Sequence, residues 1–388
     1  MIVPYAKQLI SNKNIKDVVK ILKSDFLTQG PVQKKFEEKI SKICKVKYVA
    51  TFNSATSALH ISCMALNIKK DDIVWTSTNS FVASANCALY CNAKIDLLDI
   101  SSNDFNIDLD LLEKKLEHAK AKDKLPKAIV IVHFGGLPPD LKKIGYLKKK
   151  FKFKVIEDAS HSLGAKYFSE PVGNCKYSDI TVFSFHPVKI ITTAEGGAAT
   201  TNSLSLYKKL KQLSFHGITK DKKKFINKSK PNWYYEHQML GYNYKLNEVQ
   251  SALGISQLKH LNSWVKKRNI IAKRYQNEFK NLPISFQIIK KKIYSAFHLF
   301  VIIIKKNKLN ISRDKIFEIL KSKGIITNIH YIPIHRQPYY KKFNFQIKDF
   351  KSAEKYYENC LSIPMYAGLT FKLQSKVIKE IKKIFKSK

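Results

Sequence analysis

The chain has 388 residues, of which 44% are hydrophobic and 26% are charged, so it can bury a sizeable core and is not intrinsically disordered. This length predicts two domains, or one large domain with an appendage, and it excludes a small scaffold held together by disulfide bonds. The formal net charge is +40, from 70 Lys and Arg residues against 30 Asp and Glu residues.

From about residue 14 to residue 260, short apolar segments rich in β-branched residues alternate with amphipathic segments of helical length. This alternation predicts an α/β domain with a mostly parallel sheet. A first helix is expected to begin at Pro31, since proline is favoured in the first turn of a helix. The expected strands are Lys47–Phe52, Ile73–Thr76, Lys94–Asp99, Ala128–His133, Lys154–Glu157 and Ile180–Phe185. The expected helices between them are Ser54–Leu66, Phe81–Cys91, Leu109–His118, Leu141–Phe151 and Leu204–Ser214.

Beyond about residue 260, the pattern changes to that of a smaller α+β domain. We therefore expect a large domain over residues 1–260, whose first residues can join the small domain, and a small C-terminal domain over residues 261–388. The polar, lysine-rich segment Lys220–Asn232 is expected to form a mobile loop. The elements expected in the small domain are a helix at about Asn262–Phe279, a strand at Ala296–Ile304, a helix near Arg313–Lys323, a short strand at Ile325–Ile329 and two terminal helices.

Charge and cysteine content bear on the partners and on the compartment. Only four of the 70 basic residues are Arg, the residue preferred for contacts with bases and phosphates. This favours compositional bias and solvated helix faces over nucleic-acid binding, and it leaves open the attraction of an anionic substrate. The six cysteines form no CxxC pair, so no metal site is expected. The N-terminus has no signal-like segment and the longest apolar run, Leu299–Ile304, is too short for a membrane span, so we expect no membrane partner and a reducing cytoplasm.

Lys189 differs from most other lysines of the chain in its surroundings. Between Phe183 and Thr193 it has no charged neighbour apart from the titratable His186. Loss of hydration favours the neutral amine, which is a nucleophile for carbonyl carbon, so a Schiff-base role is chemically available. The alternative is a lysine that extends its amine to solvent from an apolar strand end.

Asp158 follows an apolar strand, and it lies 31 residues before Lys189. Ligands of open α/β sheets bind beyond the carboxyl ends of the strands. A carboxylate there suits pyridoxal phosphate, because the acid keeps the pyridine nitrogen protonated while the lysine carries the aldehyde carbon. His161 could bond the hydroxyl of the ring. The alternative for Asp158 is a helix cap.

A phosphate site is expected in the segment Asn53–Ala58. This segment follows a strand and opens a helix, so free backbone N–H groups and small hydroxyl side chains would point toward one anion. Ser184, five residues before Lys189, could add another hydroxyl. The alternative is a plain helix N-cap.

These motifs, in this order, resemble the DegT/DnrJ/EryC1/StrS family of pyridoxal-phosphate-dependent sugar aminotransferases, and the resemblance covers nearly the whole chain. The most specific stretch is Ser184–Gly197, which contains Lys189 and ends in Thr-Thr-Ala-Glu-Gly-Gly. Within the family, the sequence most resembles the transaminases of pseudaminic acid biosynthesis. The other matching stretches are Leu27–Pro31, Phe52–Leu59, Ser80–Asn86, Glu157–Gly164, Gly241–Glu248 and His330–His335.

The resemblance implies a fold-type-I aminotransferase with a seven-stranded, mostly parallel sheet in a large domain that binds pyridoxal phosphate. It also implies a homodimer whose sites are shared at the subunit interface. Lys189 would form the Schiff base, Asp158 would pair with the pyridinium and His161 would lie near the ring oxygen. Asn243 would reach the neighbouring subunit's phosphate; the alternative is a loop residue that bonds its own backbone. The other implied contacts are Phe81 on the ring, Ala55, Thr56 and Ser184 at the phosphate, and Tyr331 and His335 at the substrate.

The implied reaction moves the amino group of L-glutamate to the 4-keto carbon of a nucleotide-linked 4-keto-6-deoxy sugar. The expected acceptor is UDP-2-acetamido-2,6-dideoxy-β-L-arabino-hexos-4-ulose, and the alternatives are its D-configured isomer or a dTDP- or GDP-linked keto-sugar. The rivals of another class are a basic nucleic-acid-binding protein and a pseudoenzyme. Many relatives have an arginine where this chain has Ser214, which puts an anion clamp there in doubt. The lysine at position 189 argues against the dehydratase branch of the family, where histidine replaces it.

Overall fold

The computed structural model describes residues 2–227, 230–305 and 311–386, and it is built around a seven-stranded sheet. The strand order is β1-β9-β8-β5-β4-β2-β3, and of these seven strands only β9 runs antiparallel to its neighbours. The predicted mostly parallel sheet is therefore confirmed. The strands are β1 (Tyr48–Phe52), β2 (Ile73–Ser77), β3 (Lys94–Leu98), β4 (Ala128–Val132), β5 (Lys154–Asp158), β8 (Ile180–Ser184) and β9 (Gly197–Thr201).

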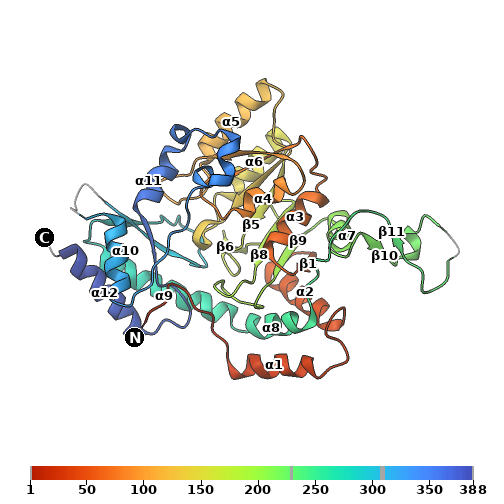
Figure 1. Cartoon of the computed structure of the whole chain (residues 1–388), viewed down its shortest axis with the longest axis horizontal. Helices are drawn as coiled ribbons and strands as arrows, with labels where there is room; N and C mark the ends of the chain where they lie inside the picture. Colours follow the sequence, from red (N-terminus) through yellow and green to blue (C-terminus); the bar gives the residue numbers. More distant parts are fainter. Residues whose placement is uncertain (1, 228–229, 306–310, 387–388) are drawn as a thin grey trace.

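Helices cover both faces of this sheet (Figure 1). In β4, Ala128 and Val130 pack with the helices of one face, whereas Ile129 and Ile131 pack with those of the other. Burial on both faces explains why β4 is a continuous apolar run in the sequence. The helices of the first face are α3 (Ala55–Ala65), α4 (Ala83–Leu89) and α7 (Leu204–Leu213), and those of the second are α2 (Pro31–Cys44), α5 (Leu109–Ala121) and α6 (Leu141–Phe151).

A second apolar cluster surrounds a three-stranded antiparallel sheet, β12-β14-β15, in the C-terminal part of the chain. Val3 packs in the same cluster, and it pairs with Ile325 in an isolated bridge. The division into domains at residue 260 stays a prediction. The elements here are α9 (Leu261–Phe279), β12 (Ile284–Phe286), β14 (Phe300–Ile304), α10 (Arg313–Ser322), α11 (Lys351–Asn359), β15 (Cys360–Ile363) and α12 (Phe371–Lys386).

Several elements differ from those expected. The short strand expected at Ile325–Ile329 is wrong, because this segment makes only isolated bridges, to Val3 and to Ser362. The strand expected at Ala296–Ile304 begins four residues late, since Phe297 has a left-handed φ of 45° that a strand cannot contain. The sequence pattern did not indicate α1 (Asn12–Leu22), α8 (Glu248–Leu258), β9, β12 or β15.

Residues 218–227 and 230–237 belong to an arm that extends from the end of α7, away from the central sheet (Figure 1). The arm pairs β10 (Ile218–Thr219) with β11 (Glu236–His237), and it includes a short 3₁₀ turn at Lys222–Lys224. The loop expected at Lys220–Asn232 falls in this arm, and its residues 228 and 229 lie outside the described residues. A small peripheral sheet is made of β6 (Lys166–Tyr167), β7 (Glu170–Pro171) and β13 (Ile293–Tyr294).

Candidate active site

A cavity of about 390 Å³ lies at the carboxyl ends of β4, β5 and β8, beside the N-terminus of α3. Ligands of open α/β sheets bind at this position, and the volume lies in the range of small-molecule sites. The cavity brings together eight of the residues that the sequence and the resemblance indicated. They are Ala55, Thr56, Phe81, Asp158, His161, Ser184, Lys189 and Tyr331.

Asp158 is the last residue of β5, and its side chain is held from two sides. The hydroxyl of Ser84, in α4, donates to Oδ2 at 2.6 Å. Ser160 donates to Oδ1 from its hydroxyl at 2.6 Å and from its backbone N–H at 3.2 Å. Because both oxygens accept hydrogen bonds from different elements, the carboxylate has one orientation at the cavity wall.

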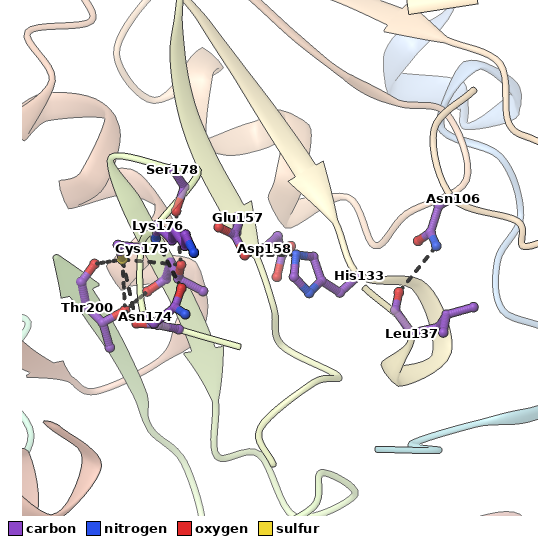
Figure 2. A network of polar contacts seen from close by, with 12 residues as sticks. Asn106, His133, Leu137, Glu157, Asp158, Asn174, Cys175, Lys176, Ser178 and Thr200 are labelled. Atoms are coloured by element: carbon purple, nitrogen blue, oxygen red, sulfur yellow. Dashed lines mark hydrogen bonds and ion pairs between the residues drawn. The ribbon is translucent and has the colours of Figure 1, made fainter. Parts of the chain in front are cut away.

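The residue before Asp158 points to the opposite face of the sheet, as alternation along a strand requires. Glu157 is buried there, and its Oε2 lies 3.1 Å from Nε2 of His133, which follows β4 (Figure 2). The backbone N–H of His133 also bonds the carbonyl of Asp158 at 3.0 Å. Neither Glu157 nor His133 lines the cavity, so this pair supports the strand ends behind the site.

Lys189 lies in the loop after β8, where its backbone N–H bonds the carbonyl of His186 at 2.9 Å. Its side chain lines the cavity. Burial lowers the pKa of Lys189 to about 8, and the nearby charge of Asp158 opposes this shift in part. A large fraction of the amine is therefore neutral, and nucleophilic, at pH values where an ordinary lysine is charged.

The N-terminus of α3 forms the third wall of the cavity. Ser54 is its N-cap, and its hydroxyl accepts a backbone N–H of the first turn at 3.0 Å. The N–H groups of Ala55 and Thr56 also belong to this turn, where a helix offers no acceptor, and both residues line the cavity. Ser184 adds a hydroxyl from the end of β8, and Gly197 of β9 lets the backbone of α3 approach closely. This arrangement suits an anionic group.

Aromatic rings and a buried histidine complete the cavity. Phe81 is 57% exposed, and its ring centroid lies 6.1 Å from that of Tyr331. His161 is buried; its Nδ1 accepts the N–H of Gly135 at 3.3 Å, and its Nε2 lies 3.1 Å from the hydroxyl of Tyr331. Burial and the charge of Lys189 hold the pKa of His161 well below its usual range, so the ring is neutral.

Two predicted site residues lie outside the cavity. Asn243 precedes α8, and its side-chain oxygen accepts a hydrogen bond from Lys245 at 2.9 Å. His335 is buried with both ring nitrogens in use, since Nδ1 lies 2.6 Å from Thr78 Oγ1 and Nε2 lies 2.7 Å from Glu354 Oε1. His335 is thus held by two side chains of its own subunit, and its contact with a substrate stays a prediction.

The sequence missed several residues of the cavity, among them Tyr5, Asn328 and Ile329, whereas His330 belongs to a stretch that carries the family resemblance. Tyr5, Asn328 and Ile329 reach the site through the packing of distant segments, so no local pattern marks them. His298 was visible as a lone polar residue in an apolar run, which is the one signal that could have indicated it. Burial lowers the pKa of His330 to about 3, and its Nδ1 lies 2.8 Å from Ser362 Oγ.

Among residues 2–227, 230–305 and 311–386, no three His, Cys, Asp or Glu side chains are arranged to hold a metal ion. Over the same residues, no helix combines the length and the apolar character that crossing a membrane requires.

Comparison with known proteins gives one consistent result. The DegT/DnrJ/EryC1/StrS aminotransferase family matches residues 8–382. A UDP-4-amino-4,6-dideoxy-N-acetyl-beta-L-altrosamine transaminase from Campylobacter jejuni is 40% identical, over 97% of this chain and 95% of its own. Helicobacter pylori PseC, an aminotransferase involved in the biosynthesis of pseudoaminic acid, has a TM-score of 0.90 and 32% identity, with 100% of both chains covered. Spr1654 of Streptococcus pneumoniae, solved in its PLP form, has a TM-score of 0.88 and 26% identity, with 99% of this chain and 98% of its own covered.

The chain therefore belongs to the DegT/DnrJ/EryC1/StrS aminotransferase family. It is a sugar aminotransferase that depends on pyridoxal phosphate, and the predicted fold type, enzyme class and cofactor are confirmed. The residues present fit this cofactor, because the amine of Lys189, the oriented carboxylate of Asp158 and the first turn of α3 line one cavity.

Proposed function

We propose that this enzyme transfers the amino group of L-glutamate to the 4-keto carbon of UDP-2-acetamido-2,6-dideoxy-β-L-arabino-hexos-4-ulose. The observation that carries the proposal is the 40% identity, over nearly the whole chain, to a transaminase whose name describes the corresponding 4-amino sugar. The likeness to PseC supports the same substrate class. The D-configured UDP isomer and dTDP- or GDP-linked keto-sugars are the alternatives.

In this proposal, Lys189 and Asp158 are the catalytic residues. Pyridoxal phosphate, when bound, supplies an electrophilic carbon and a ring that withdraws electrons. Lys189 would hold the cofactor through Nζ, and as a free amine it would carry a proton from Cα of the amino donor to the cofactor carbon. General acid–base catalysis of this kind typically raises the rate about 10²–10⁴-fold. Asp158 keeps a proton on the ring nitrogen, while Ser84 and Ser160 fix the orientation of its carboxylate.

The other residues of the cavity bind and orient the cofactor in this proposal. The backbone N–H groups of Ala55 and Thr56, with the hydroxyl of Ser184, would hold the phosphate at the positive end of the α3 dipole. Phe81 would cover one face of the ring, since its side chain is exposed at the cavity edge. His161 would lie beside the ring oxygen.

The proposed active form is a homodimer whose two sites are shared. Large apolar side chains are exposed at the end of α1 and just after it, at Leu22, Phe26 and Leu27. Such a group of exposed apolar residues is typical of a surface that another chain covers. Asn243 lies outside the cavity of its own chain, and in the dimer it would bind the phosphate held by the partner subunit.

The compartment and the net charge fit the same proposal. All six cysteines are free thiols, as expected in a reducing cytoplasm. A net charge of +40 would raise the local concentration of an anionic sugar nucleotide, although the lysine-rich composition itself favours compositional bias as its origin.

The proposal is tested by incubating the purified enzyme and L-glutamate with UDP-, dTDP- and GDP-linked 4-keto-6-deoxy sugars. We expect an amino sugar and 2-oxoglutarate, with kcat/KM at least tenfold higher for the β-L-arabino UDP sugar, and no product with Lys189→Ala. A preference for another sugar nucleotide contradicts the substrate assignment. Turnover of none of them contradicts the proposed substrate class.

A further inference from the structure

The hydrogen bonds around His161 determine which of its ring nitrogens carries the hydrogen. The N–H of Gly135 donates to Nδ1 at 3.3 Å, so Nδ1 has no hydrogen of its own. Because the ring is neutral, its one hydrogen is on Nε2. Nε2 therefore donates to the oxygen of the Tyr331 hydroxyl, 3.1 Å away.

The donor that fixes this tautomer belongs to a rigid turn after β4. Gly135 and Gly136 have φ values of 66° and 101°, in the left-handed region that favours glycine. Asn106 closes the turn, since its Oδ1 accepts the N–H of Phe134 at 2.8 Å and its Nδ2 donates to the carbonyl of Leu137 at 3.2 Å (Figure 2). The N–H of Gly135 is thus held in place independently of any ligand.

Tyr331 accepts from His161, so its own hydrogen is free for another partner. Within the described part of the chain, its hydroxyl makes no second hydrogen bond. Burial and the nearby charge of Asp158 raise the pKa of Tyr331, so the hydroxyl keeps its hydrogen over the physiological range. Because Tyr331 lines the cavity, its hydroxyl hydrogen can be donated to an acceptor bound there.

We propose that Tyr331 donates a hydrogen bond to an oxygen of the bound ligand, in a directed chain that runs from the Gly135 amide through His161. His161 is the positioning residue, because in its Nε2–H form it cannot accept the Tyr331 hydrogen. The inference rests on the proposed function only for the source of the oxygen, which is the ring oxygen of the cofactor or the keto oxygen of the sugar.

The tautomer is measured in cofactor-free protein labelled with ¹⁵N-histidine. The resonances that disappear in His161→Gln identify the ring, and we expect Nδ1 without hydrogen and Nε2 with it. A ring with its hydrogen on Nδ1, or with hydrogens on both nitrogens, overturns the proposal. This measurement needs neither cofactor nor sugar, so it stands or falls separately from the proposed function.

Tyr331→Phe then removes the hydroxyl and keeps the ring. If the cofactor supplies the oxygen, we expect about tenfold weaker cofactor binding. We also expect a higher pKa for the bound cofactor, measured from the change of its visible absorbance with pH. If the sugar supplies it, cofactor binding and its spectrum stay normal, and kcat/KM falls about tenfold for the sugar but not for glutamate. Wild-type values for the cofactor and for whichever keto-sugar the enzyme accepts overturn the proposal.

Tyr275→Phe is the control for these measurements. Tyr275 is also buried and donates its hydroxyl to the carbonyl of Pro364 at 3.0 Å, but it lies outside the cavity. We expect this variant to change cofactor affinity and spectrum by less than about twofold. If Tyr275→Phe and Tyr331→Phe weaken cofactor binding equally, the effect comes from the loss of any buried hydroxyl. That result would overturn the proposed contact.

Discussion

The hydroxyl of Ser84 lies 2.6 Å from Oδ2 of Asp158, and this contact joins α4 to the end of β5. Both side chains are buried, and a hydrogen bond to a charged group contributes roughly 1.5–3 kcal/mol. Phe81 lies at the cavity edge only three residues before Ser84. One short helix and the turn before it therefore position two proposed contacts of the cofactor ring.

Ser84→Ala removes one of the two side chains that orient the carboxylate of Asp158. We expect about tenfold weaker cofactor binding, measured by titrating the cofactor-free protein and following visible absorbance. Ser84→Thr keeps the hydroxyl and should restore most of the affinity, whereas Asp158→Asn should weaken binding further and abolish most turnover. Wild-type affinity in Ser84→Ala, or an active Asp158→Asn variant, contradicts these roles.

The lowered pKa of Lys189 predicts a particular pH dependence of its reactivity. In the cofactor-free protein, the neutral fraction of this amine rises as the pH rises through about 8, whereas an ordinary lysine stays charged up to about 10.5. Competitive labelling with acetic anhydride, read by mass spectrometry, should give an apparent pKa near 8 at position 189. A value of about 10.5 there would show that the amine is not desolvated.

Gly197 is predicted to be necessary for the phosphate site. A Cβ at this position would lie 2.6 Å from the backbone N of Ala55, so Gly197→Ala must displace the first turn of α3. We expect cofactor affinity to fall at least tenfold in the titration. Gly368→Ala is the matched control, because its Cβ would meet no atom closer than 3.6 Å. Equal affinities of the two variants would contradict the assignment.

Glu248 belongs to one of the stretches that carry the family resemblance. In the structure its carboxylate caps the N-terminus of α2. It is buried, and its oxygens accept the N–H groups of Val32 at 2.6 Å and Gln33 at 3.1 Å, at the start of α2. Glu248→Ala should lower the free energy of unfolding by about 2 kcal/mol, since two donors lose their partner. Thermal unfolding measures this, and the exposed Glu38→Ala, on the same helix, is the control. Equal melting temperatures of the two variants contradict the cap.

The sequence predicted the six parallel strands of the central sheet because they are short, largely apolar runs, of which β4 and β8 are buried along their whole length. It missed β9, whose sequence Gly-Ala-Ala-Thr-Thr has no bulky apolar residue. Gly197, the first residue of β9, shows why small residues stand there, since the backbone of α3 leaves no room for a side chain. Tertiary contacts therefore determine this strand, and the periodicity of the sequence does not indicate such contacts.

The same distinction holds for the site. Asp158 and Lys189 were predictable, because a strand-terminal acid and an isolated lysine are local features of the sequence. The contact of Ser84 with Asp158 and the arrival of Tyr5 at the cavity depend on how distant segments pack. His335 belongs to a motif that suggested substrate binding, and its contacts with Thr78 and Glu354 were not visible in the sequence.

The covalent attachment point of the cofactor tests the central claim most directly. The purified holoenzyme is reduced with borohydride and digested, and its peptides are sequenced by mass spectrometry. The chain has 66 lysines, and we predict that the cofactor mass is found on Lys189 alone. Cofactor on a different lysine, or on none, would contradict the account.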